Sequence, residues 1–150
     1  MALWFTEQHT DDVRFSIHIK EQLYSGKSYY QQIEVFDSYE FGRVLVLDGY
    51  IMLTEKDEYI YHEMMVHVPM ACNPDIRRVL VIGAGDGGTV RELCRYDSIT
   101  QIDMVEIDEQ VVKVCKEYGT PVFMKDSLRD LMRDGFRQEF PWIVGGSELF

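Results

Sequence analysis

The sequence predicts an α/β fold, in which a small amino-terminal β domain precedes a Rossmann-like domain with a parallel sheet. Residues 1–56 consist largely of short apolar segments separated by turn residues, as in antiparallel strands. Two later apolar strand patterns, at 77–83 and 101–107, alternate with helical patterns, as a parallel sheet requires. A glycine-rich loop joins the first of these strands to the helix that follows.

Residues 1–56 form the predicted β domain. Strand patterns occupy 14–20 (RFSIHIK), 29–36 (YYQQIEVF) and 43–54 (RVLVLDGYIMLT). The last of these holds Asp48-Gly49 between two apolar runs, which is the strongest short hairpin signal in the chain. We therefore expect a tight hairpin at this dipeptide.

Residues 57–150 form the predicted second domain, which opens with a helix. The stretch 57–72 (DEYIYHEMMVHVPMAC) begins with acidic residues that suit a helix amino terminus. Its apolar positions share one face, and the pattern ends near Asn73-Pro74. This helix leads into the strand and helix alternation.

The alternation itself consists of a strand at 77–83, a helix at 89–97, a strand at 101–107 and a helix at 108–118. The first strand is a continuous apolar run, as expected where both faces of a sheet are covered. These four segments predict one strand, helix and strand unit followed by a second helix.

The pattern weakens after residue 118. One amphipathic helical stretch lies around 125–133, followed by a short apolar run and two glycines. The segment 119–150 is too short for the three or more further strand and helix pairs that close a doubly wound domain. We therefore expect the second domain to be incomplete after about residue 118.

The glycine-rich loop predicts a nucleoside site. Gly83, Gly85 and Gly88 satisfy the pattern G-x-G-x-x-G directly after an apolar strand and before a helix. Glu106 follows at the end of the next strand pattern, where an acidic residue meets a ribose hydroxyl in this kind of fold. The order of strand, loop, helix, strand and acid makes the motif more specific than the glycines alone.

Asp86 is an unexpected residue within that loop. A carboxylate there would repel a pyrophosphate, whereas it would attract a cationic ligand. A carboxylate hydrogen-bonded to an ammonium is worth roughly 1.5 to 3 kcal/mol. Asp86 therefore points to a positively charged substrate. The alternative is that Asp86 is a turn residue that caps the helix beginning at Thr89.

The composition limits the function classes. The chain has 150 residues, of which 46% are hydrophobic, so it can bury one sizeable core. Its net charge of -11 disfavours nucleic acid and anionic membranes as partners, and it suits cationic substrates. No apolar run approaches the roughly 18 residues that span a bilayer, and the start lacks the regions of a signal peptide.

The cysteines indicate a reducing compartment. Cys72, Cys94 and Cys115 are widely spaced and include no C-x-x-C pair. A cytoplasmic location is the simplest interpretation of this pattern.

Four segments together resemble bacterial spermidine synthase, an aminopropyltransferase of polyamine biosynthesis: YQQIEVF, RVLVLDGYIMLTEKDEYIYHEM, VLVIGAGDGGTVREL and IDMVEIDEQVV. The resemblance covers most of residues 1–118. It implies an amino-terminal β domain before a methyltransferase-like Rossmann domain, in a homo-oligomer. It also implies decarboxylated S-adenosylmethionine as the aminopropyl donor, a co-substrate rather than a cofactor, and putrescine as the acceptor, with methylthioadenosine released.

The resemblance implies a role for individual residues. Glu106 is the ribose ligand, Gln31 contacts the nucleoside, and Asp86 holds the amine of the aminopropyl chain or of the polyamine. The nucleoside-binding set implied is Gln31, Gly83, Gly85, Glu106, Asp134 and Gly135. The polyamine-binding set implied is Tyr61, His62 and Asp86.

Asp134-Gly135 has two interpretations. The dipeptide lies 28 residues after Glu106 (134 − 106) and matches the Asp-Gly loop that reads the adenine in the family. It also fits a surface helix end with a glycine stop, which the local pattern favours.

The catalytic residue is unassigned. The amine of putrescine must lose a proton before it can attack the methylene next to the sulfonium, because its pKa in water is about 10.4, as for lysine. In the family that base is an aspartate of a DSxDP-type motif, which this sequence lacks. We therefore expect impaired turnover.

Two other functions stay open. A methyltransferase that uses S-adenosylmethionine would share the Rossmann half and the ribose acid, although the β domain disfavours it. A shortened, non-catalytic chain could instead associate with other subunits through its β domain and through apolar surface left on an incomplete sheet.

No metal site is predicted. His62 and His67 in HEMMVH are five residues apart, whereas a zinc-binding pair on a helix needs a separation of four.

Overall fold

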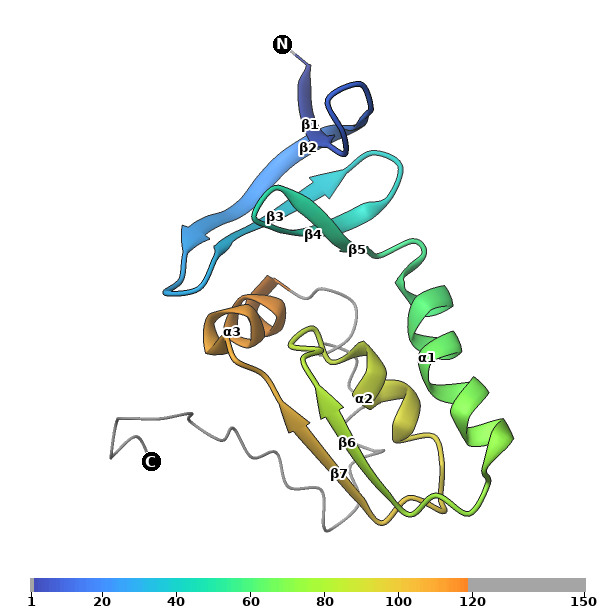
Figure 1. Cartoon of the computed structure of the whole chain (residues 1–150). Coiled ribbons are helices and arrows are strands. Elements are labelled where there is room, and N and C mark those ends of the chain that lie inside the picture. The colour runs from blue at the N-terminus through green and yellow to red at the C-terminus, as the bar shows by residue number, and fades with distance from the viewer. Residues whose placement is uncertain (1, 119–150) are drawn as a thin grey trace.

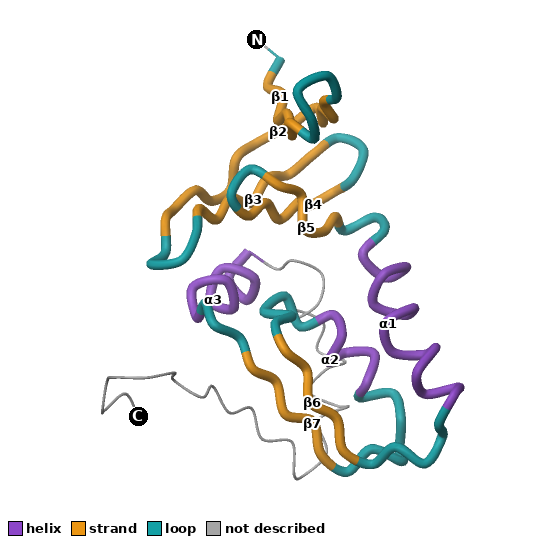
Figure 2. Tube along the Cα trace, viewed as in Figure 1, coloured by secondary structure: helices purple, strands orange, loops and turns teal. Residues whose placement is uncertain are grey.

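The protein contains two sheets and three helices in the residues that the structure, a computed structural model, describes, which are 2–118 (Figure 1). The amino-terminal strands are β1 (Leu3–Gln8), β2 (Arg14–Lys27), β3 (Gln32–Ser38), β4 (Gly42–Leu47) and β5 (Tyr50–Thr54). The remaining elements are α1 (Glu58–Cys72), β6 (Arg78–Ile82), α2 (Gly88–Leu93), β7 (Gln101–Val105) and α3 (Glu109–Tyr118). Figure 2 shows the two groups of strands in orange. The helix α3 lies between them, and α1 runs along one side. The predicted α/β class is confirmed.

The amino-terminal sheet is an antiparallel meander in the order β1-β2-β3-β4-β5. The hairpin predicted at Asp48-Gly49 is present between β4 and β5, with Leu47 opposite Tyr50. Both turn residues have positive φ, 51° at Asp48 and 83° at Gly49. That backbone conformation is the one a two-residue hairpin requires, and Asp-Gly adopts it at low cost.

The start of this sheet differs from the prediction. β1 is not among the predicted strands, because LWFTEQ carries little apolar alternation, and its place depends on antiparallel pairing with β2. β2 also continues to Lys27, seven residues past the predicted end of the strand pattern at residue 20. β3 begins later than predicted, because the Ser28 hydroxyl oxygen accepts hydrogen bonds from the backbone N–H groups of Tyr30 and Gln31 and closes a turn. Pairing across the sheet therefore decides these boundaries.

The helix α1 agrees with the predicted helix 57–72 to within one residue. Its buried residues recur every four positions and are Glu58, His62, Val66 and Met70. This spacing places them on one face, which lies beside α2. Two of the four are ionisable, so this face is more than an apolar contact.

A parallel strand pair forms the second sheet. β6 and β7 pair in register from Arg78 opposite Gln101 to Ile82 opposite Val105, and α2 crosses between them. α2 ends at Leu93, whereas the sequence pattern predicts a helix to residue 97. The backbone N–H of Tyr96 bonds to the carbonyl of Leu93, which continues the chain as turns. The strand, helix and strand unit is thus confirmed with a shorter helix.

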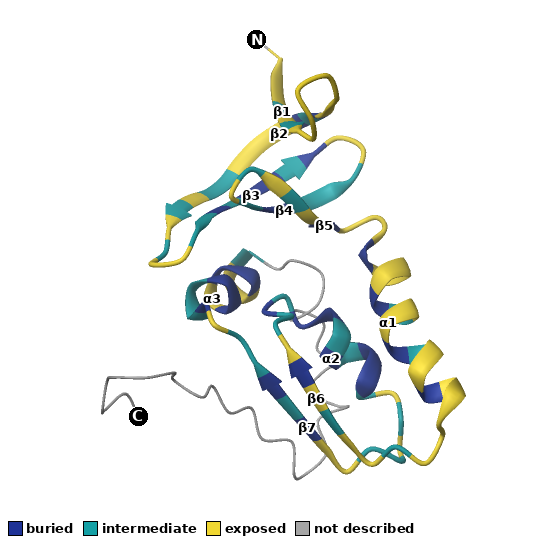
Figure 3. Cartoon of the chain, in the orientation of Figure 1, coloured by how far each residue is buried: buried dark blue, intermediate teal, exposed yellow. Residues whose placement is uncertain are grey.

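The hydrophobic core of residues 2–118 has three parts. One lies among α1, α2, β6 and β7, and includes Val66 and Met104. Another covers one face of the amino-terminal sheet, around Phe36 and Val44. The third joins the opposite face of that sheet to α3, which lies next to the sheet and is partly dark blue in Figure 3; its buried members are Ile33, Val35, Leu45, Leu53, Val111, Val114 and Cys115. α3 therefore packs on the amino-terminal sheet, although it follows β7 in the chain.

The predicted helical stretch at 125–133 and the Asp134-Gly135 dipeptide lie outside the described residues. Within residues 2–118, no helix is long and apolar enough to cross a membrane.

Candidate active site

The glycine-rich loop between β6 and α2 lies directly against Glu106. The backbone N–H of Gly85 donates a hydrogen bond to Oε2 of Glu106 over 2.9 Å. A Cβ atom at residue 85 would lie 2.9 Å from that same oxygen, closer than real contacts allow. A side chain at residue 85 would therefore push the carboxylate of Glu106 away from the loop, and glycine allows the close approach.

Glu106 is held by backbone groups on two sides. Besides the bond from Gly85, its Oε1 accepts a hydrogen bond from the backbone N–H of Asp108 over 3.0 Å. Two fixed donors orient the carboxylate at the end of β7 and leave each oxygen one further lone pair. The residue predicted as the ribose ligand is thus preorganised as a hydrogen-bond acceptor.

Asp86 lies next to His62 of the helix α1. Its Oδ1 accepts a hydrogen bond from the backbone N–H of Gly88 over 2.7 Å and lies 3.3 Å from Nε2 of His62. Its Oδ2 receives no hydrogen bond from residues 2–118. Asp86 is therefore a turn residue, whereas the N-cap of α2 is Gly87 and no side chain of the described residues caps that helix. One oxygen of Asp86 is available to a ligand.

His62 is buried between two carboxylates. Its side chain is only 4% exposed, Nδ1 lies 2.6 Å from Oε2 of Glu58, and Nε2 faces Asp86. Its ring also packs on the glycine loop, because a Cβ at Gly88 would lie 2.2 Å from Cε1 of His62. Both ring nitrogens of His62 are therefore engaged inside the protein.

Arg91 completes this network from α2. It donates two hydrogen bonds to the carboxylate of Glu58, over 2.7 Å from Nη1 and 3.0 Å from Nη2. Arg91, Glu58, His62 and Asp86 then alternate in charge along one chain of contacts. Such alternation compensates buried charges that would otherwise be costly.

The network changes the protonation of its members. Burial disfavours the charged form of His62, but its hydrogen bonds to Asp86 and Glu58 outweigh burial and raise the pKa of His62 to about 9. Burial likewise opposes ionisation of Glu58, and the hydrogen bonds from His62 and Arg91 prevail and lower the pKa of Glu58 to about 2. At neutral pH, His62 is therefore an imidazolium between two carboxylates.

A cavity of about 960 Å³ opens beside this network, between α1 and β6. Tyr61, His62 and Asp86 all line it, so the structure brings the three predicted polyamine residues to one surface. Tyr61 is 63% exposed, and most of the remaining lining is apolar, with Leu80 and Ile82 of β6 exposed to solvent. The cavity thus combines a carboxylate with apolar walls.

Gln31 does not line that cavity. Its Nε2 donates a hydrogen bond to Oδ2 of Asp108 over 2.9 Å. Asp108 is the residue whose backbone N–H holds Glu106. Gln31, from the amino-terminal sheet, and Glu106, from the end of β7, are thereby linked through one residue.

The predicted site residues therefore form two groups. Gln31 and Glu106 are linked through Asp108, and Tyr61, His62 and Asp86 line the cavity; Asp134-Gly135 falls outside the described residues. Sequence reasoning missed Glu58, Arg91 and Asp108. The four-residue spacing of Glu58 and His62 on one helix was a usable signal, whereas Arg91 and Asp108 gain their partners only through the fold.

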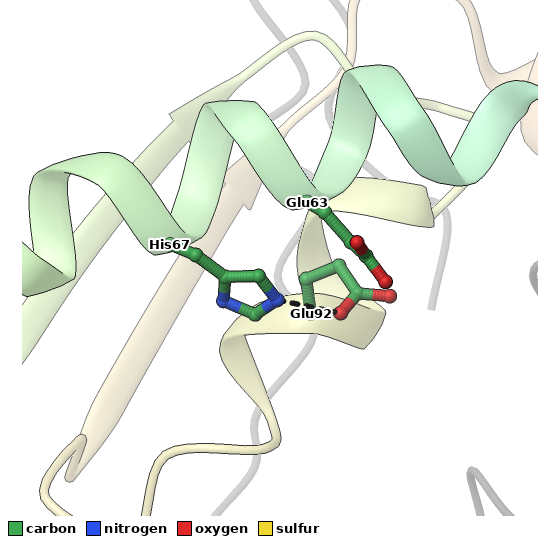
Figure 4. Close-up of side chains that lie close together, drawn as sticks. All are labelled: Glu63, His67 and Glu92. Atoms are coloured by element: carbon green, nitrogen blue, oxygen red, sulfur yellow. Dashed lines mark ion pairs between the residues drawn. The ribbon is translucent and has the colours of Figure 1, made fainter.

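A second cluster, formed by Glu63, His67 and Glu92, has the residue types of a metal site (Figure 4). Their ligand atoms all lie within 4.8 Å of one another. Arg91 and Arg95, however, already bind the buried carboxylate of Glu92, over 2.8 and 2.7 Å. A metal cation would have to compete with two guanidinium groups there, so the arrangement is that of an ion-pair network.

Two family models match the chain. One, described as the spermidine synthase tetramerisation domain, matches residues 3–55. The other, described as the spermine/spermidine synthase domain, matches residues 58–130.

Curated relatives are similar to most of the chain. The polyamine aminopropyltransferase of Clostridium perfringens (strain 13 / Type A) is 70% identical over 118 residues. The polyamine aminopropyltransferase of Lachnoclostridium phytofermentans is 66% identical over the same number of residues. In both comparisons the match covers 79% of this chain and 42% of the relative, so the matched part spans less than half the length of these proteins.

Solved structures share the fold. A crystal structure of spermidine synthase in complex with the transition state analogue AdoDATO matches with a TM-score of 0.82 and 35% identity. The spermidine synthase from Thermotoga maritima matches with a TM-score of 0.80 and 36% identity. Each match covers 92% of this chain and 47% of the other.

Proposed function

Because the chain belongs to the spermine/spermidine synthase family, as its motifs predicted, we propose that it carries donor-binding and amine-binding surfaces of an aminopropyltransferase. The proposed reaction moves an aminopropyl group from decarboxylated S-adenosylmethionine to putrescine and gives spermidine and methylthioadenosine. One observation carries the proposal. The glycine loop holds an oriented acceptor, Glu106, and includes a carboxylate with an available oxygen, Asp86.

The donor would bind through its nucleoside. Glu106 retains a lone pair on each oxygen for ribose hydroxyls, and Asp108 links Gln31 to Glu106 by hydrogen bonds to both residues. Gly83 and Gly85 would allow the loop backbone to approach the ligand closely. The donor is consumed in the reaction, so it is a co-substrate and we propose no cofactor. A relative with a transition state analogue bound, at 35% identity, supports a substrate site in this fold.

The amine groups would bind on the cavity side. Oδ2 of Asp86 would accept from an ammonium group, and the exposed ring of Tyr61 would line the alkyl chain of the polyamine. His62 would act through Asp86, because Glu58 and Asp86 engage both of its ring nitrogens. The imidazolium partly compensates the charge of Asp86, so the attraction for a cation depends on hydrogen bonding at Oδ2 as well as on charge.

The chemical step is a displacement at carbon. A neutral amine nitrogen attacks the methylene next to the sulfonium, the new carbon–nitrogen bond forms, and the carbon–sulfur bond breaks to release methylthioadenosine. The proton on the attacking ammonium must first pass to a base. The family aspartate for this step belongs to a DSxDP-type motif that these 150 residues do not contain. We therefore propose that this chain binds both substrates and that its turnover is low.

The two units are proposed to divide between residues 56 and 57. They are in contact, since α3 packs on the amino-terminal sheet. We further propose that the chain is a homo-oligomer. Trp4, His18 and Tyr39 support this, because they form a stacked aromatic surface on the amino-terminal sheet, with Trp4 56% and Tyr39 62% exposed. The three cysteines form no disulfide within residues 2–118, which supports a cytoplasmic location.

The first test is a thermal melt of the 150-residue protein with and without methylthioadenosine. A ligand at about 100 times its dissociation constant adds roughly 2.7 kcal/mol to the folded state, so the melting temperature should rise. A turnover assay with putrescine and decarboxylated S-adenosylmethionine then measures activity. Absence of any shift would reject the nucleoside site, and methyl transfer from S-adenosylmethionine would favour a methyltransferase instead.

A further inference from the structure

Asp108 is a buried carboxylate to which the proposed reaction gives no direct role. It follows β7, immediately before α3, and it is only 2% exposed. We propose that Asp108 is a positioning residue that turns the side-chain amide of Gln31, so that the carbonyl oxygen of Gln31 faces the nucleoside. The inference rests on the proposed function, and it adds which hydrogen-bonding groups of the ligand the nucleoside site selects.

Three hydrogen bonds hold the carboxylate of Asp108. Its Oδ2 accepts from the hydroxyl of Ser28 over 2.7 Å and from Nε2 of Gln31 over 2.9 Å. Its Oδ1 accepts from the backbone N–H of Gln110 over 3.0 Å. Two of the donors come from the loop between β2 and β3, about 80 residues earlier in the chain. Asp108 therefore connects that loop to the end of β7.

The chemistry of the two groups fixes the orientation of Gln31. A carboxylate can only accept hydrogen bonds, so it must face the amide nitrogen and not the amide oxygen. Oε1 of Gln31 then points away from Asp108, and none of residues 2–118 donates a hydrogen bond to it. The site thus presents a carbonyl acceptor whose direction is set by Asp108.

Glu106 is a second acceptor that Asp108 positions. The backbone N–H of Asp108 bonds to Oε1 of Glu106, so the same residue positions both groups. A surface made of a carboxylate and an outward carbonyl suits a ligand that offers several hydrogen-bond donors, such as ribose hydroxyls or an amino group. We therefore infer that the nucleoside site selects for donors at Gln31.

The alternative role for Asp108 is to cap α3. Its Oδ1 bond to the N–H of Gln110, at the second helical position, has the geometry of an N-cap. Asparagine caps helices about as well as aspartate does, so Asp108→Asn keeps this function. The amide nitrogen introduced there would then replace Oδ2, and the Gln31 amide would have to turn round, with Nε2 facing the ligand. The substitution separates the two roles.

The experiment measures the calorimetric affinity of methylthioadenosine for four variants of the 150-residue protein. These are Asp108→Asn, Gln31→Glu, the double variant, and Glu109→Gln as a matched control on α3, where the side chain is partly exposed. Asp108→Asn should weaken binding roughly tenfold, which corresponds to one hydrogen bond. Gln31→Glu should also weaken binding, because two carboxylates then face each other. The control should match the wild type.

The double variant is the decisive measurement. The amide introduced at position 108 then donates to one oxygen of the carboxylate introduced at position 31, and the other oxygen of that carboxylate faces the ligand as an acceptor again. Affinity should therefore return to within about threefold of the wild type, since the lost hydrogen bond is restored. Wild-type affinity in Asp108→Asn, or a double variant as weak as Asp108→Asn, would overturn the inference.

A ligand-free measurement separates this inference from the proposed function. Hydrogen exchange of the Gln31 side-chain amide, assigned by its loss in Gln31→Glu, should be slower in the wild type than in Asp108→Asn. Equal rates overturn the positioning role. A wild type that binds no methylthioadenosine refutes the proposed function, and the exchange rates still decide the orientation of Gln31.

Discussion

Arg91 binds the carboxylate of Glu58 through two hydrogen bonds, over 2.7 and 3.0 Å, and thereby connects α2 to the first turn of α1. Glu58 in turn contacts His62, and His62 contacts Asp86 of the glycine loop. A charge network inside the protein thus leads to the loop that we propose binds the substrates. Each residue of this network can be substituted separately.

The first prediction concerns stability. Glu58→Gln removes one charge from the buried network and leaves Arg91 and His62 without their shared carboxylate. The free energy of unfolding should fall by about 3 kcal/mol, the lower end of the range for breaking a buried pair. Urea denaturation measures this free energy.

Glu63→Gln is the control on the same helix, where the side chain is 45% exposed. It should change stability by no more than about 0.5 kcal/mol. Equal effects of the two substitutions would contradict the network.

The second prediction concerns pH. The pKa of His62 is raised from 6.5 to about 9 in the folded protein, so its protonation stabilises the fold fully below about pH 6.5. This contribution is lost as the pH rises through about 9. The pKa of Glu58 is lowered from 4.5 to about 2, so its contribution is present above about pH 4.5 and is lost as the pH falls through about 2.

Urea unfolding across this pH range tests both statements. The wild type should be most stable between about pH 4.5 and 6.5 with respect to these two groups. The variant His62→Gln should lose the decline between about pH 6.5 and 9 that His62 causes. A decline of the same size in both proteins would show that other groups are responsible.

The third prediction concerns charge selectivity. Asp86→Asn keeps the side-chain shape but removes the negative charge next to the cavity. Binding of spermidine and decarboxylated S-adenosylmethionine should weaken roughly tenfold, whereas binding of neutral methylthioadenosine should change by about twofold or less. Calorimetry measures all three. Equal weakening of every ligand would identify Asp86 as a structural residue of the turn.

The fourth prediction concerns the ribose acid. Glu106→Gln replaces one carboxylate oxygen by an NH₂ group that meets a backbone N–H, from Gly85 or from Asp108. Every adenosine-containing ligand should bind roughly ten- to a hundredfold more weakly. Glu109→Gln serves again as the control, because that side chain is partly exposed on α3. Unchanged affinity for methylthioadenosine in Glu106→Gln would exclude the ribose role.

The sequence by itself determined the local elements and the position of the loop. The Asp48-Gly49 hairpin, the helix α1 and the order of β6, α2, β7 and α3 follow from turn residues and apolar periodicity, which act over a few residues. Gly85 and Glu106 were also predictable as a pair, because the order of strand, loop and acid places them at the same sheet end.

Only the tertiary structure decided which distant side chains meet. β1 depends on its pairing with β2. The helix α3 follows β7 in the chain but packs on the amino-terminal sheet. The sequence predicts that Asp86 binds a cation, and the fold places one beside it in His62, which Asp86 and Glu58 hold in its charged form. The physical reason is that periodicity and turn chemistry are local, whereas a buried charge can be tolerated only where the whole fold brings its partners together.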